Sequence, residues 1–416
     1  MEDELNRYLA GEYGVDIPAR HSHESGNPES LDSCLHRNDR YQKWLASHKP
    51  FHWFIEFYGI LKKGGFDAII GNPPYVEYSK VAKEYSVKNY RTESCGNLYA
   101  FVMERNQVLV SKKGRSGMIV PHSAFCTDRM GRVINLFDKE VKLWTSTYAI
   151  RPCKLFVGSD QRIAIYLTRF DPKNEGYSTC YHWWHEEFRP SLFDLLKYAP
   201  INSFPYKNSL PKVSSTIESN IWNKIQAYQP LALKLSGNAI AYYHNAPRYW
   251  IRSMIFAPYF WNERDGEQIS TQVKPIRLPN KIEASAVVAT LNSSLFYWWF
   301  IILSDCRHLN LREIEAFPLG LDQINGASKK DLSELSTRLM TDLKRYANLK
   351  ETNYKATGRV IYDEYYPRYS KPIIDEIDRV LAQHYGFTDE ELDFIINYDI
   401  KCRMGLGEKE TEKEDN

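Results

Sequence analysis

The spacing of apolar residues predicts an α/β domain in the first half of the chain. Residues 66–71, FDAIIG, form a short apolar run directly after two glycines, which is typical of a buried parallel strand. We expect a helix over residues 98–109 and further strands at 117–121, 146–150 and 162–169. Strands that alternate with helices along the sequence predict an α/β sheet.

The same pattern divides the chain into five parts. Residues 17–40 have no apolar periodicity and predict loop or disorder, and their sequence resembles peptides translated from dispersed bacterial repeat DNA. Residues 283–303 predict one long apolar helix, and the proline-rich stretch before residue 236 predicts a connector. The expected parts are a disordered or insertion-derived segment (1–40), the α/β domain (41–170), the connector (171–235), a second domain (236–320) and a helical region with a charged tail (321–416).

Composition narrows the class of protein. The 416 residues suffice for two or three domains, and an apolar fraction of 43% excludes wholesale disorder. The longest apolar run, residues 295–303, is too short to cross about 30 Å of hydrocarbon, and the charged N-terminus has no secretory signal. The seven cysteines form no CxxC pair, so neither a disulfide framework nor a metal site is expected. We expect a cytoplasmic protein that does not bind membranes.

Charge is distributed unevenly. Residues 321–416 hold 15 Lys and Arg against 20 Asp and Glu, which leaves a net charge of +7 on residues 1–320. That region is also rich in aromatic residues, which suit base stacking but more often fill cores, and we expect the helical stripe Phe296–Phe300 to be core. The balance is compatible with a polyanionic partner without identifying one.

The tetrapeptide Asn72-Pro73-Pro74-Tyr75 directly follows the first predicted strand. Open α/β sheets bind ligands at the carboxyl ends of their strands, so this is a candidate site. The alternative interpretation is a rigid Pro-Pro turn with an Asn cap.

These four residues suit one particular chemistry. An exocyclic amine on a heteroaromatic ring is a poor nucleophile because its lone pair is delocalised into the ring. The side-chain oxygen of Asn72 and the carbonyl of Pro73 can accept both N–H bonds and draw the nitrogen toward a tetrahedral geometry. The ring of Tyr75 offers a flat face for stacking. No strong base is needed, because the proton leaves after the new bond forms.

Several segments, in this order, resemble one enzyme family. FDAIIGNPPYVEYSK resembles the catalytic motif of class I, S-adenosylmethionine-dependent amino-methyltransferases, and more narrowly the adenine-N6 DNA methyltransferases of the Eco57I/TaqI-like (type IIG) restriction-modification family. GNLYAFVMERNQVLV resembles the family's next helix, so Tyr99 is a candidate pocket residue. KLFVG resembles a late motif whose aromatic residue packs on the flipped base, which makes Phe156 a candidate second stacking residue. Residues 236–320 resemble a TaqI-like target-recognition domain.

The resemblance implies a fold and a partner. It implies a partial class I (Rossmann-like) methyltransferase sheet that lacks its first strands, followed by an α+β target-recognition domain and a helical C-terminal tail. Double-stranded DNA is the implied partner. In the recognition domain, Arg248, Arg252, Lys274 and Arg277 are candidates to bind phosphates or read guanine edges, although the same residues would also suit a solvated surface.

The sequence departs from the family in its cofactor site. The family binds S-adenosylmethionine with a Gly-rich loop upstream of NPPY, and no such loop is recognisable before Asn72 or further along this chain. We therefore expect the C-terminal half of a larger methyltransferase, truncated or completed by a separately encoded N-terminal half. Two alternatives stay open: a non-catalytic DNA-binding specificity fragment, and an amino-methyltransferase that acts on RNA or on protein glutamine.

Overall fold

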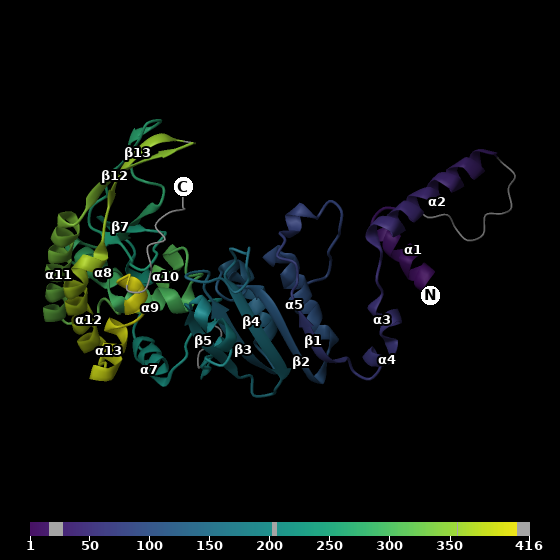
Figure 1. Cartoon of the computed structure of the whole chain (residues 1–416), viewed down its shortest axis with the longest axis horizontal. Coiled ribbons are helices and arrows are strands. Elements are labelled where there is room, and N and C mark those ends of the chain that lie inside the picture. The colour runs from purple at the N-terminus through teal and green to yellow at the C-terminus, as the bar shows by residue number, and fades with distance from the viewer. Residues whose placement is uncertain (16–27, 202–205, 356, 406–416) are drawn as a thin grey trace. The chain divides into compact units, whose positions relative to one another are not determined.

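The computed structural model describes residues 1–15, 28–201, 206–355 and 357–405 (Figure 1). They belong to two compact units. The first comprises Met1–Met118 and Thr168–Phe170, and the second comprises Ile119–Leu167 and Asp171–Asn416. The predicted division into five parts stays a prediction.

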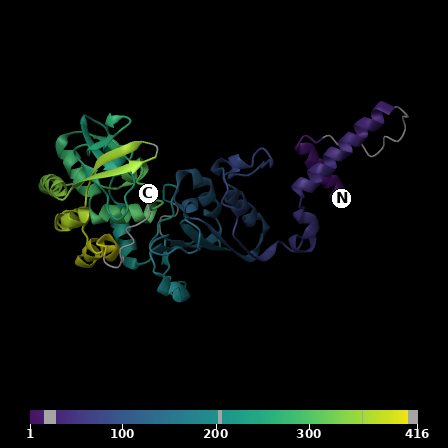
Figure 2. The same ribbon diagram turned by 45° about the horizontal axis from the view of Figure 1, so that its top comes forward.

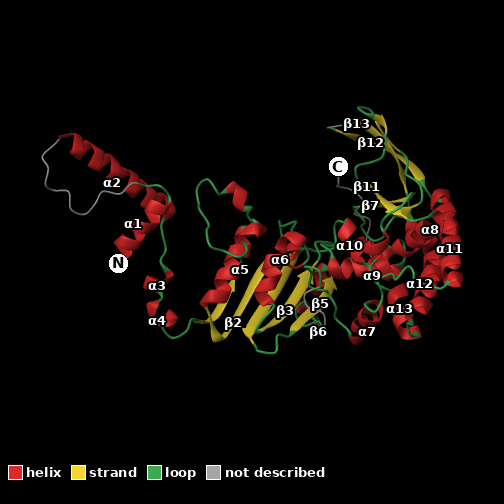
Figure 3. Cartoon of the chain, turned by 180° about the vertical axis from the view of Figure 1, so that it is seen from behind, coloured by secondary structure: helices red, strands yellow, loops and turns green. Residues whose placement is uncertain are grey.

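A six-stranded sheet contains every strand predicted for the α/β domain. Its order is β1-β2-β4-β3-β5-β6, with β1 parallel to β2, β3 parallel to β5, and β5 antiparallel to β6 (Figure 3). The predicted mixed α/β class is therefore confirmed. The strands are β1 (Phe66–Gly71), β2 (Val110–Pro121), β3 (Val141–Tyr148), β4 (Ile163–Phe170), β5 (Gly176–His182) and β6 (Ala199–Pro200).

Strand β1 begins and ends where the sequence predicted, but it is not buried. It lies at the edge of the sheet, and Ile70 is 87% exposed. Gly65, at φ +117°, precedes it in close contact with the backbone of Leu109 and Ser111, where a side chain would clash. A strand paired on one edge leaves the other edge and part of its faces to solvent, whatever its composition. Helix α5 (Leu98–Leu109) joins β1 to β2 as predicted.

The N-terminal segment contains helices α1 (Glu2–Glu12), α2 (Pro28–His48), α3 (Trp53–Glu56) and α4 (Tyr58–Leu61). The expectation of loop or disorder is wrong for residues 28–40, and residues 16–27 lie outside the described residues. Tyr41 and Trp44 of α2 pack with Ala10 of α1 in a small buried cluster. The contacts that stabilise α2 thus lie beyond residue 40, where a search for periodicity within 17–40 could not find them.

The interval predicted as a connector contributes to the folded core. Strands β5 and β6 belong to the six-stranded sheet, and helix α7 (Thr216–Ile225) buries Ile221, Trp222 and Ile225. The short helix α6 (Gly131–Ile134) lies between β2 and β3. Prolines in this interval therefore do not indicate an unfolded linker, and Pro200 itself belongs to β6.

Two further sheets lie between residues 239 and 364. One has the order β11-β7-β8 and the other β10-β9-β13-β12. Strands β12 and β13 form an antiparallel hairpin that pairs with β9, so the prediction that residues 321–416 are helical is wrong at this hairpin. The strands are β7 (Ala239–His244), β8 (Ser253–Met254), β9 (Phe260–Asn262), β10 (Gly266–Glu267), β11 (Val273–Leu278), β12 (Asn348–Tyr354) and β13 (Gly358–Glu364).

The predicted long apolar helix is divided into α8 (Lys281–Leu291) and α9 (Ser294–Leu303), which are bent by 65°. Ser293 causes the division, because its hydroxyl accepts a hydrogen bond from the backbone N–H of Phe296 and so caps α9. The side chain of Asp378 accepts the next two N–H groups, those of Ser294 and Leu295, each at 3.1 Å.

Helix α9 is buried throughout, which confirms that the stripe Phe296–Phe300 is core. In the described part of the chain no single helix is long and apolar enough to cross a membrane, and α8 with α9 meets such a criterion only as a bent pair. Helices α11, α12 and α13 pack beside α8 and α9 (Figures 1 and 2). The remaining helices are α10 (Leu311–Ala316), α11 (Gly326–Arg345), α12 (Lys371–Tyr385), α13 (Asp389–Ile396) and α14 (Ile400–Arg403); the predicted charged tail lies outside the described residues.

The open face of β1 leads to a stability prediction. Replacing Ile70 by Lys should change the free energy of unfolding by no more than about 0.5 kcal/mol, because the side chain is exposed. Met118, on the neighbouring strand β2, is buried, and Met118→Ala should cost about 2–5 kcal/mol. Urea titration of both variants measures the difference. A loss with Ile70→Lys as large as that with Met118→Ala would contradict the exposed edge.

Candidate active site

The Asn72–Tyr75 turn leaves β1 at its carboxyl end. Asn72 is exposed, Pro73 is buried, and Tyr75 is half-buried. The buried Pro73 anchors the turn, and its ring fixes its own φ angle. The backbone of Asn72 is therefore held on both sides, by the end of β1 before it and by the buried Pro73 after it.

The two acceptors predicted for an amine are unengaged. Neither the side-chain amide of Asn72 nor the carbonyl of Pro73 has a hydrogen-bond partner among the described residues. An Asn cap of the kind considered as the alternative would show an N–H group bonded to the Asn72 side chain, and no described residue provides one. Neither oxygen atom is therefore already occupied by a hydrogen-bond donor from the described residues.

Tyr75 is supported from one edge by another aromatic ring. Tyr99 of α5 is buried, and its ring lies edge-on to Tyr75 with centroids 6.2 Å apart and an interplanar angle of 89°. Burial raises the pKa of the Tyr75 phenol to about 12, so the ring is neutral at physiological pH. Tyr99 thus helps to orient Tyr75, and its predicted role as a pocket residue stays a prediction.

Backbone bonds hold the residues after Tyr75 against the start of α5. The N–H of Tyr78 donates to the carbonyl of Gly96 at 2.9 Å, and the N–H of Leu98 donates to Val76 at 3.0 Å. Gly96 adopts φ +60°, a left-handed conformation that favours glycine. These contacts restrict the direction in which the chain leaves the candidate site.

Glu104 on α5 was missed in the sequence analysis. Its carboxylate accepts hydrogen bonds from the N–H of Arg91 at 3.1 Å, the N–H of Thr92 at 2.9 Å and the Thr92 hydroxyl at 2.8 Å. Burial acts to raise its pKa, but these hydrogen bonds outweigh burial, and the pKa lies below its ordinary value. Glu104 fixes the loop before α5 and has no catalytic geometry. A carboxylate that directly follows the apolar run 98–103 of a predicted helix is the signal that could have revealed it.

Phe156, the candidate second stacking residue, lies in the second unit and is 42% exposed. Its segment is fixed by Arg189, which donates to the carbonyl oxygens of Lys154 and Leu155 at 2.9 and 3.1 Å. An exposed ring on a restrained segment suits a stacking role, which stays a prediction.

The four candidate DNA-binding residues differ in their surroundings. Lys274 and Arg277 are exposed on β11, and Arg248 is exposed in the loop between β7 and β8. Arg252, at the end of that loop, is half-buried and donates to Nδ1 of His244 at 3.2 Å. Three of the four candidates, Arg248, Lys274 and Arg277, are thus exposed, whereas Arg252 is half-buried and held by a hydrogen bond to His244.

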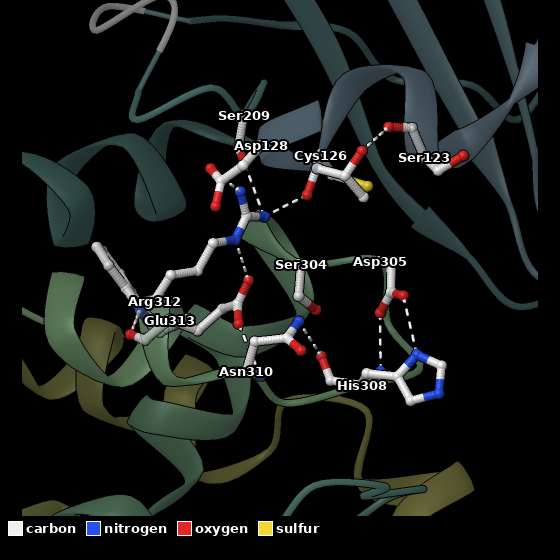
Figure 4. Close-up of polar contacts among 12 residues, drawn as sticks. Ser123, Cys126, Asp128, Ser209, Ser304, Asp305, His308, Asn310, Arg312 and Glu313 are labelled. Atoms are coloured by element: carbon white, nitrogen blue, oxygen red, sulfur yellow. Dashed lines mark hydrogen bonds and ion pairs between the residues drawn. The ribbon is translucent and has the colours of Figure 1, made fainter. Parts of the chain in front are cut away.

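Arg312 on α10 is a second residue that sequence reasoning missed. Its guanidinium donates to Asp128 at 2.7 Å, to Glu313 at 2.7 Å and to the carbonyl of Cys126 (Figure 4). Glu313 also accepts from the N–H of Asn310, which completes a capping box. Arg312 therefore fastens the segment after β2 to α10, although the two are far apart in the sequence.

The comparisons with known proteins show similarity to restriction-modification methylases. Residues 18–147 match the model of the Eco57I restriction-modification methylase family, which confirms the predicted resemblance. The chain is 28% identical over 222 residues to a protein of Methanocaldococcus jannaschii classed provisionally as a type II restriction enzyme and methyltransferase. The match covers 51% of this chain, and the chain spans only 18% of the length of that relative.

Two solved structures are similar at lower levels. The type IIL restriction-modification enzyme MmeI in complex with DNA has 11% identity and a TM-score of 0.45, covering 97% of this chain and 63% of that one. The type IIG restriction endonuclease BpuSI has 10% identity and a TM-score of 0.27, covering 80% of this chain and 54% of that one.

The buried carboxylate of Glu104 leads to a pH-dependent prediction. Glu104→Gln should lower the free energy of unfolding by about 1–3 kcal/mol at pH 7, because the loss of charge weakens three hydrogen bonds. A carboxylate with a lowered pKa stabilises the fold above its unfolded pKa, 4.5, and loses this contribution as pH falls through the folded pKa. The gap between variant and parent should therefore shrink below pH 4.5.

Chemical denaturation at pH 7 and pH 4 measures this gap. Glu93→Gln, at an exposed position of the same loop, is the control and should stay within about 0.5 kcal/mol. An equal loss for the two variants, or a gap that grows in acid, would contradict the role of Glu104.

Proposed function

We propose that this chain is part of a DNA methyltransferase that methylates N6 of adenine. The observation that carries the proposal is the pair of unengaged acceptors, Asn72 Oδ1 and the Pro73 carbonyl, at the carboxyl end of β1 beside Tyr75. The match of residues 18–147 to the Eco57I family supports it. Truncation, adenine specificity and the identity of the methyl donor are parts of this proposal.

The chemistry follows from the two oxygens. Each accepts one N–H bond of the adenine amine, so the nitrogen lone pair turns out of conjugation with the ring and becomes nucleophilic. Tyr75 stacks on the base, which must first leave the duplex to reach a site of this kind. Neither acceptor is a base, so the proton departs to water after the methyl group has been transferred.

The methyl donor we propose, S-adenosylmethionine, supplies an electrophilic methyl group. The described residues contain no Gly-rich loop between a strand and a helix next to β1, so they do not fit the cofactor's binding site, and we assign none of them to it. We propose that the cofactor-binding residues come from outside this sequence. The unpaired edge of β1 and the exposed Ile70 support this, because a further strand could pair there. A separately encoded N-terminal half is one source of such a strand.

DNA is the proposed partner of the second unit. The exposed cations Arg248, Lys274 and Arg277 suit contacts to phosphates, which position a protein on the duplex without reading its sequence. Phe156 is proposed as a second stacking residue for the extruded base.

The open edge of β1 also favours a second candidate, a specificity fragment that binds DNA without catalysis. Isothermal titration of the isolated chain with S-adenosylmethionine separates the two when it is followed by the same titration in the presence of the complementing half. Heat of binding only in the complemented sample supports the enzyme. No heat in either sample, with duplex binding retained, supports the fragment.

Substitution of Asn72 tests the proposed chemistry. In the complemented enzyme, Asn72→Ala should lower kcat by about 100-fold or more, because one of the two acceptors is removed. Its affinity for duplex DNA should change little, since phosphate contacts dominate binding. Transfer of a radiolabelled methyl group and fluorescence anisotropy measure the two quantities.

Asn38→Ala, at an exposed position of α2, is the matched control and should leave both quantities unchanged. Full methylation by the Asn72→Ala enzyme would refute the proposed role of the turn. A complemented enzyme that methylates cytosine and not adenine would refute the proposed substrate.

A further inference from the structure

Arg252 is half-buried, whereas several exposed arginines of the second unit pair with carboxylates. Arg264, Arg338 and Arg359 each form an ion pair with a carboxylate, at 2.9, 2.7 and 2.6 Å. Arg252 forms none with any described residue, although it is half-buried. Glu364 attracts it from a distance, but the Glu364 oxygens are engaged by Lys350 and Tyr366. A half-buried cation without a partner is costly unless something else supplies acceptors.

The backbone that carries Arg252 is rigid. Its carbonyl accepts from the N–H of His244 at 2.9 Å, and both of its neighbours, Ile251 and Ser253, are buried. The side chain of Asn292 accepts from the Ser253 N–H at 3.1 Å and donates to the Ser253 carbonyl at 2.8 Å. The position of the Arg252 Cα atom is therefore determined by the core.

His244 orients the guanidinium. Its Nδ1 accepts from Nη2 of Arg252 at 3.2 Å and from the N–H of Ala246 at 3.2 Å, so this nitrogen carries no proton. Burial and the nearby Arg252 lower the pKa of His244 to about 3, which keeps the ring neutral. The groups that face His244 are Arg252 and Ala246 from the loop between β7 and β8, and Gln272 before β11. Nε and Nη1 of Arg252 have no hydrogen-bond partner among the described residues.

Surface cations lie on β11, the strand that pairs with β7. Lys274 pairs with Tyr243, and Arg277 pairs with Ile240, while the neighbouring pair Val273 and His244 leads toward the loop that carries Arg252. Lys274 and Arg277 are exposed, and neither forms an ion pair among the described residues. This part of the second unit therefore combines exposed cations on β11 with one oriented, half-buried guanidinium just before β8.

We propose that Arg252 is a specificity-determining residue that donates two parallel hydrogen bonds to the O6 and N7 atoms of one guanine in the major groove. This inference rests on the proposed DNA-binding function. A guanidinium fork matches two acceptors on a guanine edge or on a phosphate, and the fixed orientation of Arg252 favours the base edge, since phosphate contacts are satisfied by mobile surface cations. Lys274 and Arg277, both exposed on β11, contact phosphates. His244 is a positioning residue that acts through Arg252.

The test uses the full chain and DNA alone. Selection from a random duplex library gives the preferred sequence, and fluorescence anisotropy then measures affinity for it and for each single-base-pair variant. Arg252→Ala should weaken binding to the preferred duplex by about 5- to 150-fold and abolish discrimination at one G·C pair only. Replacing that guanine by 7-deazaguanine, which lacks the N7 acceptor, should weaken binding by the parent chain and not by Arg252→Ala.

Two further variants separate a specific contact from a structural effect. Arg252→Lys keeps the charge but cannot form the bidentate contact, so it should not restore discrimination. Lys274→Ala should weaken binding to all duplexes by a similar factor and lower the slope of log affinity against log salt by about one. Circular dichroism of each variant verifies that it is folded.

The outcomes distinguish the sources of the acceptors. If Arg252→Ala weakens binding to every duplex equally and lowers the salt slope, with no effect of 7-deazaguanine, Arg252 binds phosphate and the proposal is overturned. Unchanged discrimination in folded Arg252→Ala also overturns it, and leaves the proposed DNA-binding function intact. A parent chain that prefers no sequence refutes DNA recognition itself, and the role of Arg252 with it.

Discussion

The one-sided pairing of β1 is the constraint on which the candidate active site depends. Hydrogen bonds to β2 along a single edge fix the direction of the strand and hence the place where Asn72 leaves it. The buried Pro73 anchors the chain directly after Asn72, and Asn72 itself is exposed. The same arrangement exposes Ile70 and leaves an edge with unsatisfied backbone groups. One structural feature therefore both positions the candidate catalytic residues and supports the proposal that a further segment completes the sheet.

The candidate active site is electrically neutral, and its rigidity comes from hydrogen bonds around it. Tyr75 keeps its proton, and both proposed acceptors are uncharged oxygens. The carboxylate of Glu104, on α5, accepts hydrogen bonds from the backbone of the loop before α5 and so holds that loop. Such a site can orient an amine and has no strong base with which to deprotonate it, which agrees with proton loss after transfer and not before.

In the second unit, the polar residues Asn292 and Ser293 interrupt an apolar stretch and separate helix α8 from helix α9. Ser293 caps α9 and Asn292 binds Ser253, so the break between α8 and α9 also fixes the strand that follows Arg252. Helix α9 is held in place because helices α12 and α13, from the last part of the chain, pack against it. The orientation of Arg252 thus derives in part from core packing at the neighbouring Ser253.

The sequence by itself determined the local elements and the candidate chemistry. It placed β1 at residues 66–71 and α5 at 98–109, it identified the turn at Asn72, and it assigned Phe296–Phe300 to the core, because period, turn residues and apolar runs are local properties. It also contained unused signals, such as the glycine at 358 before the alternating strand of the hairpin.

Tertiary structure alone decided what covers each element. Ile70 is apolar yet exposed, and the residues that stabilise α2 lie outside the stretch that looked disordered. The carboxylate that helps to cap α9 comes from Asp378, more than eighty residues away. The sequence offered Arg252 as a candidate DNA-binding residue but did not connect it with His244. The pairing of β7 with β8 brings the two side chains within hydrogen-bond distance. Periodicity records which face of an element is apolar, but burial and hydrogen bonding depend on partners that are distant in sequence, and only the folded chain brings those partners together.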